Sequence, residues 1–450
     1  MPHSKAFGIP HVALLFALAV AQGGCAVPQG IGRVSDELAQ RTGYELTEAE
    51  PGETVLPPAV SLAHGLSQDD AVAIALWNNA ALRATLADLG LSRADLIQAG
   101  MLPNPTFSMF VPVGPKPLET TFRYPLEVLW LRPYRVAAAR ADYESTAEHL
   151  VQSALDLIRD VRVAYSDVAL ADGHVAVAQE TASLAEQIAE LTAARAAAGD
   201  ISELDADTAR VDTLQAHEQL ARARYDAGMA RERLRNLLGT EATPLQSLAD
   251  PGVPPRVEED AGRLVEMALA ARPDLHAADL ALEAAGERSG LARAEVFAFA
   301  AGVSAKEEGN QFLTGPAFDL TIPILNQNQG SIARADAAVE KASRQYVSAR
   351  DRVVLEVREA HIRLRQAQES FTTWNARILP PLTDTVRRAE RAYAAGDVSF
   401  LFVLDAARKL SAARVKEVDA AAELRRAAAE LERSIGGRLP IRGDIPERAV

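Results

Sequence analysis

The chain has few cysteines, which stabilise small exported domains as disulfides, and few aromatic residues, which fill bulky globular cores. Its 450 residues include one cysteine, so no disulfide can form within the chain. Aromatic residues make up 5%, although hydrophobic residues make up 48%, much of it alanine, a balance typical of long, closely packed helices. After the N-terminal run, no stretch approaches the roughly 20 apolar residues that a spanning helix needs. Any membrane span must therefore come from strands.

The charge and the missing motifs exclude two broad classes of function. The formal net charge is −14, which makes nucleic acid an unfavourable partner. The sequence has no phosphate-binding loop, HExxH motif, paired-cysteine zinc site or nucleophile elbow. Its 8 His and 5 Met residues are scattered, so we expect no bound metal or other cofactor. The sequence argues against an exported enzyme.

The first residues have the pattern of a secretory signal peptide, which we place at residues 1–24. Lys5 precedes an apolar run over residues 12–21, and small residues follow. Two cleavage sites are open. The triplet at residues 19–21 fits an ordinary signal-peptidase site, whereas the residues before Cys25 resemble a lipoprotein signal, which would make Cys25 the lipidated residue. Both predict export.

The rest of the chain contains one unit twice, offset by about 195 residues. GDISELDADTAR starts at Gly199 and GDVSFLFVLDAA at Gly396, and forty positions further on Leu238-Gly239 corresponds to Ile435-Gly436. The repeat predicts one pseudo-symmetric body. We expect an extended N-terminal segment at residues 25–64, a first repeat at 65–239, a proline-rich linker at 240–258, a second repeat at 259–436 and a tail at 437–450.

Each repeat contains two strand-like stretches between its helices. The expected strands are residues 106–113 and 118–129 in the first repeat and residues 300–307 and 317–325 in the second. In the last of these, Phe318, Leu320 and Ile322 alternate with polar residues. An apolar face opposite a polar one is the pattern of a barrel strand whose outer side meets lipid.

Long helices are predicted to follow each strand pair. No proline occurs between Pro133 and Pro244, and apolar residues such as Leu150 and Leu157 recur with heptad spacing. At ~1.5 Å per residue, a helix over residues 136–198 would be on the order of 95 Å long. Such a length exceeds that of an ordinary globular domain.

The long helices are expected to turn back as hairpins. The return helix of the first hairpin covers residues 204–238, and the second hairpin runs from about residue 331 to its tip near Gly396 and back to Ile435, with a perturbation at Pro380-Pro381. Four strands cannot close a barrel, so a membrane role requires several chains to pool their strands. The sequence then predicts a duct: a pore extended by a tube of helices.

These features resemble the TolC-like outer-membrane efflux proteins over most of residues 62–436. The most specific parts are the duplicated order of helix, strands and long hairpin, the break at residues 101–105 and the segment IPILNQNQGSIARADA that starts at Ile322. The resemblance implies a homotrimer with a shared outer-membrane β-barrel in outer-membrane lipid, a periplasmic α-barrel, a periplasmic adaptor and an inner-membrane pump of the resistance-nodulation-division type. A periplasmic coiled-coil adaptor or scaffold without a pore is the alternative.

The resemblance also implies a gate near the hairpin tips. Asp205 and Tyr393 occupy the places of a linked aspartate and tyrosine, and Asp405 that of a ring aspartate. Phe402 replaces a second ring aspartate, and Val398 replaces a latching arginine, so the closed state would depend on fewer polar links. Aspartates gathered around an axis repel one another and attract cations. Alternatively, the aspartates only solvate the hairpin tips.

Matching small and hydroxyl residues at the two tips are the expected adaptor contacts. They are Gly199, Ile201 and Ser202 in the first tip and Gly396, Val398 and Ser399 in the second. The same residues could instead serve only as helix caps. The segment Asn326-Gln-Asn-Gln-Gly330 is similar to that of heavy-metal efflux members, which suggests metal cations as the substrate; any family member could use such a turn.

Overall fold

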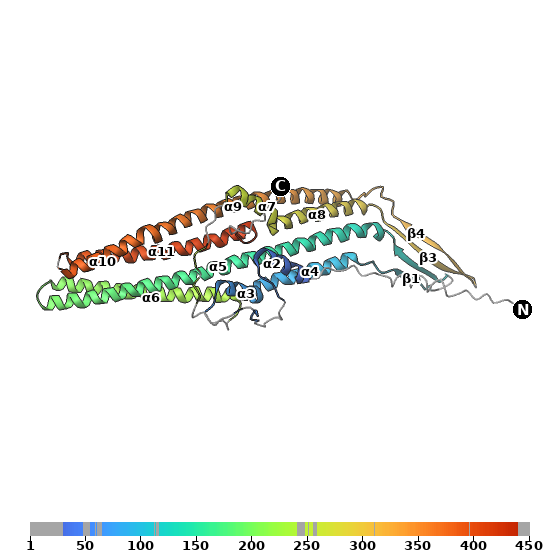
Figure 1. Ribbon diagram of the computed structural model, residues 1–450. Helices are drawn as coiled ribbons and strands as arrows, with labels where there is room; N and C mark the ends of the chain where they lie inside the picture. The colour runs from blue at the N-terminus through green and yellow to red at the C-terminus, as the bar shows by residue number, and fades with distance from the viewer. Residues whose placement is uncertain are drawn as a thin grey trace.

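The structure, a computed structural model, is a long bundle of helices with a small sheet at one end (Figure 1). It describes residues 30–47, 55–58, 60, 65–111, 113, 117–240, 248–250, 252–254, 259–309, 311–395 and 397–439. The predicted fold, mainly helical with four antiparallel strands, is confirmed. The signal peptide, Cys25, Gly396 and the tail beyond Leu439 lie outside the described residues.

The first repeat contains two short helices, two strands and a long hairpin. Its elements are α3 (Gln68–Asn78), α4 (Ala80–Gly100), β1 (Thr106–Phe110), β2 (Glu119–Pro125), α5 (Val128–Ala197) and α6 (Glu203–Leu238). Helix α5 has 70 residues, which at ~1.5 Å per residue gives a length of about 105 Å. The heptad positions Leu150 and Leu157 are buried. Side chains at these positions form an apolar stripe that packs α5 against its neighbouring helices.

The second repeat has the same order. Its elements are α7 (Ala261–Ala271), α8 (Pro273–Ala294), β3 (Phe299–Glu308), β4 (Gln311–Leu320), α9 (Gln329–Thr372), the π-helix η1 (Thr373–Ile378), α10 (Leu379–Ala395) and α11 (Phe400–Ile435). The perturbation expected at Pro380-Pro381 takes the form of η1 immediately before the prolines. Proline supplies no N–H, so the α-helical bond pattern is interrupted at this point.

The strands form one antiparallel sheet in the order β1-β2-β3-β4, but the predicted ranges of three of the four strands were wrong. Strand β1 ends at Phe110, ahead of a proline-rich stretch that lacks N–H donors for the ladder. Strand β2 ends at Pro125, and Val128 already begins α5. Strand β4 covers residues 311–320 and not 317–325, because Gly315, which precedes the expected range, already pairs with Ser304 of β3.

Helix α2 (Gly30–Thr42) corrects the prediction of an extended segment over residues 25–64. Val34 and Leu38, one turn apart, are both buried in the same hydrophobic cluster as residues of α3 and α5. Arg41 at its end donates to the carbonyl of Ala271, in the second repeat. Gly30 and Gly32 disfavour a helix in isolation, so packing of the apolar stripe decides the structure here.

The two repeats end in equivalent joints. In the first, Asn79 caps α4 and its Nδ2 donates to the carbonyl of Leu237 at 2.9 Å, beside Gly239. In the second, Arg272 precedes α8 and its Nη1 donates to the carbonyl of Ser434 at 3.4 Å, beside Gly436. In each repeat, therefore, the return helix ends against the break between the two short helices.

Candidate functional site

The tip of the first hairpin is a tight backbone turn with a capped helix after it. Gly199 has φ +84°, and the N–H of Asp200 donates to the carbonyl of Arg195 at 2.9 Å, the closure of a Schellman motif. Ser202 caps α6: its Oγ accepts from the N–H of Asp205 at 3.2 Å and donates to Asp205 Oδ2 at 2.8 Å. The structure therefore places Asp205 in a capping contact at an exposed tip.

The second hairpin is closed by the equivalent backbone hydrogen bond and has a different cap. The N–H of Asp397 donates to the carbonyl of Ala392 at 2.9 Å, which matches the first tip. Ser399 stands at the N-cap of α11, but its side chain makes no capping hydrogen bond. Its hydroxyl, like the half-buried Ile201 and Val398, is available at the tip. The two hairpins share this closing hydrogen bond and differ in how the following helix is capped.

The remaining predicted gate residues lie on α10 and α11 near the second tip. Tyr393 is half-buried on α10, whereas the Phe402 side chain is 52% exposed on the first turn of α11. Asp405 Oδ2 lies 2.7 Å from Lys409 Nζ, one helical turn further along. An exposed pair of this kind contributes little stability and leaves the carboxylate accessible.

A row of polar contacts joins α11 to the first hairpin, and the sequence did not predict it. Arg408 Nη2 lies 2.5 Å from Asp212 Oδ2 near the tips. His174 Nε2 lies 2.8 Å from Asp419 Oδ1 further along. Histidines and aspartates on long amphipathic helices usually face solvent, so their types alone do not predict such contacts. The available signal was the complementary polar residues on α11 and on the two helices of the first hairpin, but periodicity does not show which helices face each other.

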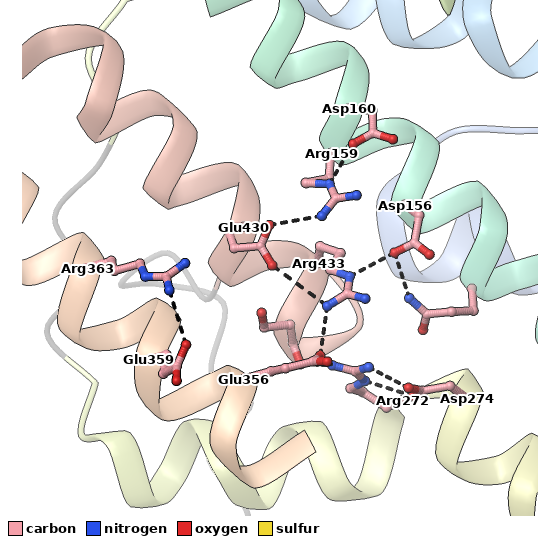
Figure 2. A network of polar contacts seen from close by, with 12 residues as sticks. Asp156, Arg159, Asp160, Arg272, Asp274, Glu356, Glu359, Arg363, Glu430 and Arg433 are labelled. Carbon is pink, nitrogen blue, oxygen red and sulfur yellow. Dashed lines mark hydrogen bonds and ion pairs between the residues drawn. The ribbon is translucent and has the colours of Figure 1, made fainter. Parts of the chain in front are cut away.

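A buried network ties the two repeats together at mid-length (Figure 2). Arg272, 1% exposed, donates to Asp274 at 2.8 Å and to Glu356 at 2.5 Å. Arg433 on α11 contacts the same Glu356 at 2.7 Å and Asp156 of α5 at 2.8 Å. Burial alone would raise the pKa of Asp274, but the hydrogen bond and charge of Arg272, with the charge of Arg433, lower it.

Between α2, α5 and α8 lies an open hollow of about 450 Å³, which we call the acidic hollow. Its polar lining residues are Arg33, Glu37, Glu144, Glu148, His276 and Asp279. Glu148 is 8% exposed, and its Oε2 accepts no hydrogen bond from the described residues. Burial, with the charge of Glu37, raises the pKa of Glu148 to about 7, against the opposing charges of Arg41 and Arg33.

The raised pKa of Glu148 makes stability depend on pH. Because the folded protein holds this proton more tightly than the unfolded chain, the free energy of unfolding should fall as pH rises from about 4.5 through about 7. Glu148→Gln should remove that fall and stabilise the protein at alkaline pH by up to about 3 kcal/mol. Denaturant unfolding across this pH range measures it. Glu218→Gln, at an exposed pair with Arg222, is the control and should keep the wild-type pH dependence. If Glu148→Gln also kept the wild-type pH dependence, the prediction would be contradicted.

The sheet has one apolar face and one charged face. Phe107, Phe122 and Val303 share one row across three strands, and all are exposed. The opposite face carries two ion pairs, Lys306–Glu119 at 3.2 Å and Arg123–Asp319 at 2.5 Å. An exposed apolar face of this kind suits contact with lipid.

Neither a spanning helix nor a preformed metal site is found within the described part of the chain. None of the helices described there is both long and apolar enough to cross a bilayer. Over the same residues, His, Cys, Asp and Glu side chains form no group of three or more arranged to hold a metal ion. The chemistry of the described residues is that of surfaces, caps and ion pairs.

Comparison with known proteins identifies the family. A family model described as outer membrane efflux protein matches residues 120–240 and 264–437, more than half of the chain. The cobalt-zinc-cadmium resistance protein CzcC of Cupriavidus metallidurans is 25% identical over 400 residues, which cover 87% of this chain and 96% of that protein.

Solved structures show the same fold. CusC, solved in a study of folding and transmembrane channel formation, matches with a TM-score of 0.69 and 21% identity over 87% of this chain and 99% of its own. The outer membrane protein VceC of Vibrio cholerae matches with a TM-score of 0.67 and 18% identity over 83% and 97%. The chain belongs to the outer membrane efflux protein family, and it is an outer-membrane efflux channel of a tripartite system and not an enzyme.

Proposed function

We propose that three copies of this channel form a gated duct that passes heavy-metal cations out of the cell. The main support for a heavy-metal substrate is the similarity to a cobalt-zinc-cadmium resistance protein along 96% of that protein's length. The chain's negative charge is consistent with a cationic cargo. A duct has no need to bind its cargo tightly.

The sheet supports assembly from several copies. Strands β1 and β4 stand at its two edges, and an unpaired edge in lipid leaves backbone N–H and C=O groups unsatisfied. Edge-to-edge pairing with further copies satisfies them and turns each apolar face outward. The long hairpins then extend the pore into the periplasm, where an adaptor and an inner-membrane pump of the resistance-nodulation-division type meet it. A lipid on Cys25 would anchor the assembly.

The tips support two roles in this proposal. Asp205, Tyr393, Phe402 and Asp405 form the gate, with Phe402 as an apolar constriction between charged groups. The paired tip residues form the adaptor contact: Gly199, Ile201 and Ser202 with Gly396, Val398 and Ser399. Both backbone turns have the same closure, so one adaptor surface could engage both tips.

Removing the polar links at the tips should open the duct. We expect Tyr393→Phe and Asp205→Asn to raise single-channel conductance in planar bilayers. The first removes the hydroxyl donor of the link, and the second removes the negative charge that strengthens it, while both keep the size of the side chain. Asparagine preserves the hydrogen-bonding shape of the Ser202 contact, so the cap of α6 stays in place. Asp207→Asn, on an exposed neighbour in the same helix, is the matched control.

Currents carried by Zn²⁺ in the same bilayers test the substrate. Cation-preferring channels that admit zinc support the proposed function. If neither variant changes the single-channel conductance, the gate assignment is refuted and the duct is retained. Well-folded oligomers without any channel activity would refute the duct itself.

A further inference from the structure

The acidic hollow is a surface that the channel function leaves unused. It lies at mid-length, where α2 of the N-terminal segment meets α5 of the first repeat and α8 of the second. Helices α5 and α8 are fastened beside it by Ser145, whose Oγ donates to the carbonyl of Ala277 at 3.0 Å. The walls of the hollow are therefore set by packed helices and not by loops.

Glu148 is the unusual member of the lining. A carboxylate taken out of water without hydrogen-bond donors costs several kcal/mol unless it is protonated or meets a donor. Glu148 is more than nine-tenths buried, and its Oε2 has no donor among the described residues. The group lines a hollow that is large enough for a small molecule. Glu148 therefore lacks a hydrogen-bond donor at a place where a small molecule has room to bind.

The charges around Glu148 favour a cation. On α2, Glu37 is already held by Arg41 at 2.6 Å, which leaves Arg33 as the further basic group. On α5 and α8, Glu144 and Asp279 add negative charge, and His276 is the remaining titratable group in the lining. The carboxylates therefore outnumber the basic groups that face them.

The geometry of the hollow favours an organic cation over a metal ion as the ligand. A metal ion needs several ligands converging at about 2–2.6 Å, and the described residues offer no such group of three. Ammonium and guanidinium groups instead bind through directional N–H donors, which can reach carboxylates spread around a hollow.

We propose that the acidic hollow is a binding site for a small organic cation with N–H donors, such as an alkylguanidinium or a polyamine, with Glu148 as the deepest acceptor. Binding requires the ionised carboxylate, so affinity should weaken as Glu148 becomes protonated at acid pH. Helix α2, which borders the hollow, lies far from the hairpin tips along α5 (Figure 1), so the proposed site is distant from the gate.

Titration calorimetry on the purified full-chain protein in detergent tests this proposal. The probe is n-propylguanidinium, with tetramethylammonium as a cation of equal charge that has no N–H donor. At about pH 8, where the carboxylate is ionised, wild type should bind the guanidinium and not tetramethylammonium. Glu148→Gln should bind it at least about 10-fold more weakly, and Glu218→Gln should bind as wild type does.

Misfolding cannot produce the expected result, because Glu148→Gln should be at least as stable as wild type at this pH. Equal affinity of wild type and Glu148→Gln, equal binding of the two cations, or no binding by the well-folded wild type would each overturn the proposal. Weakening of the wild-type affinity in acid, absent from the variant, would support it.

Discussion

Gly239→Ala should destabilise the protein far more than the corresponding change in the second repeat. Gly239 has φ +66°, and a Cβ added there would lie 2.3 Å from the backbone oxygen of Asn78. The left-handed backbone alone costs a non-glycine residue about 1–2 kcal/mol. The clash is with backbone, so the end of α6 must also move away from the α3–α4 break. We expect a total loss above about 4 kcal/mol.

Gly436→Ala is the matched control for this prediction. Gly436 has φ +78°, but its added Cβ would lie 3.3 Å from the backbone oxygen of Ala271, a distance that a small shift relieves. Its cost should stay near the left-handed penalty of about 1–2 kcal/mol. Denaturant midpoints of the two variants give the comparison. Equal losses would mean that the two joints are mechanically equivalent and that the closer approach at Gly239 has no energetic consequence.

Arg272→Met should remove the centre of the buried network. The guanidinium donates hydrogen bonds to the carboxylates of Asp274 and Glu356 and to the carbonyl of Ser434. Methionine fills similar space but leaves Asp274 without its main partner and Glu356 with Arg433 alone. Breaking a buried pair in this way costs about 3–5 kcal/mol.

The pH dependence of the loss gives a second readout. The pKa of Asp274 is lowered in the folded protein, so its contribution is present above its ordinary pKa and disappears as pH falls through the folded value. The loss in Arg272→Met should therefore be smaller in acid than at neutral pH. Arg363→Met, which breaks an exposed pair with Glu359, should cost less than about 1 kcal/mol. A loss as small for Arg272→Met would contradict the role of the network.

The sequence predicted the features that depend on local chemistry. The tip at Gly199 follows from a residue that can adopt positive φ between two helical patterns. The break at Asn79 has a local cause of the same kind, because its side chain caps the next helix. The duplicated order of elements follows from the repeat. Each of these signals lies within a few residues of the structure that it specifies.

Features that depend on contacts between distant segments were missed. Helix α2 forms because Val34 and Leu38 find a buried surface on other helices. Strand β4 begins early because Gly315 has a partner in β3. The buried position of Arg272 depends on carboxylates from residues that are distant in the sequence, such as Glu356. Periodicity describes one helix at a time and does not show which helices become neighbours.

The π-helix η1 changes the angular phase of the helix that contains it. Leu379 donates to the carbonyl of Trp374, five residues back, so one extra residue is accommodated in that turn. One residue corresponds to roughly 100° around a helix axis. A stripe of side chains that follows one line along α9 therefore reappears on α10 rotated by about that angle. Alanine scans or cysteine labelling designed on a single heptad would therefore report faces about 100° apart before Thr373 and after Ile378.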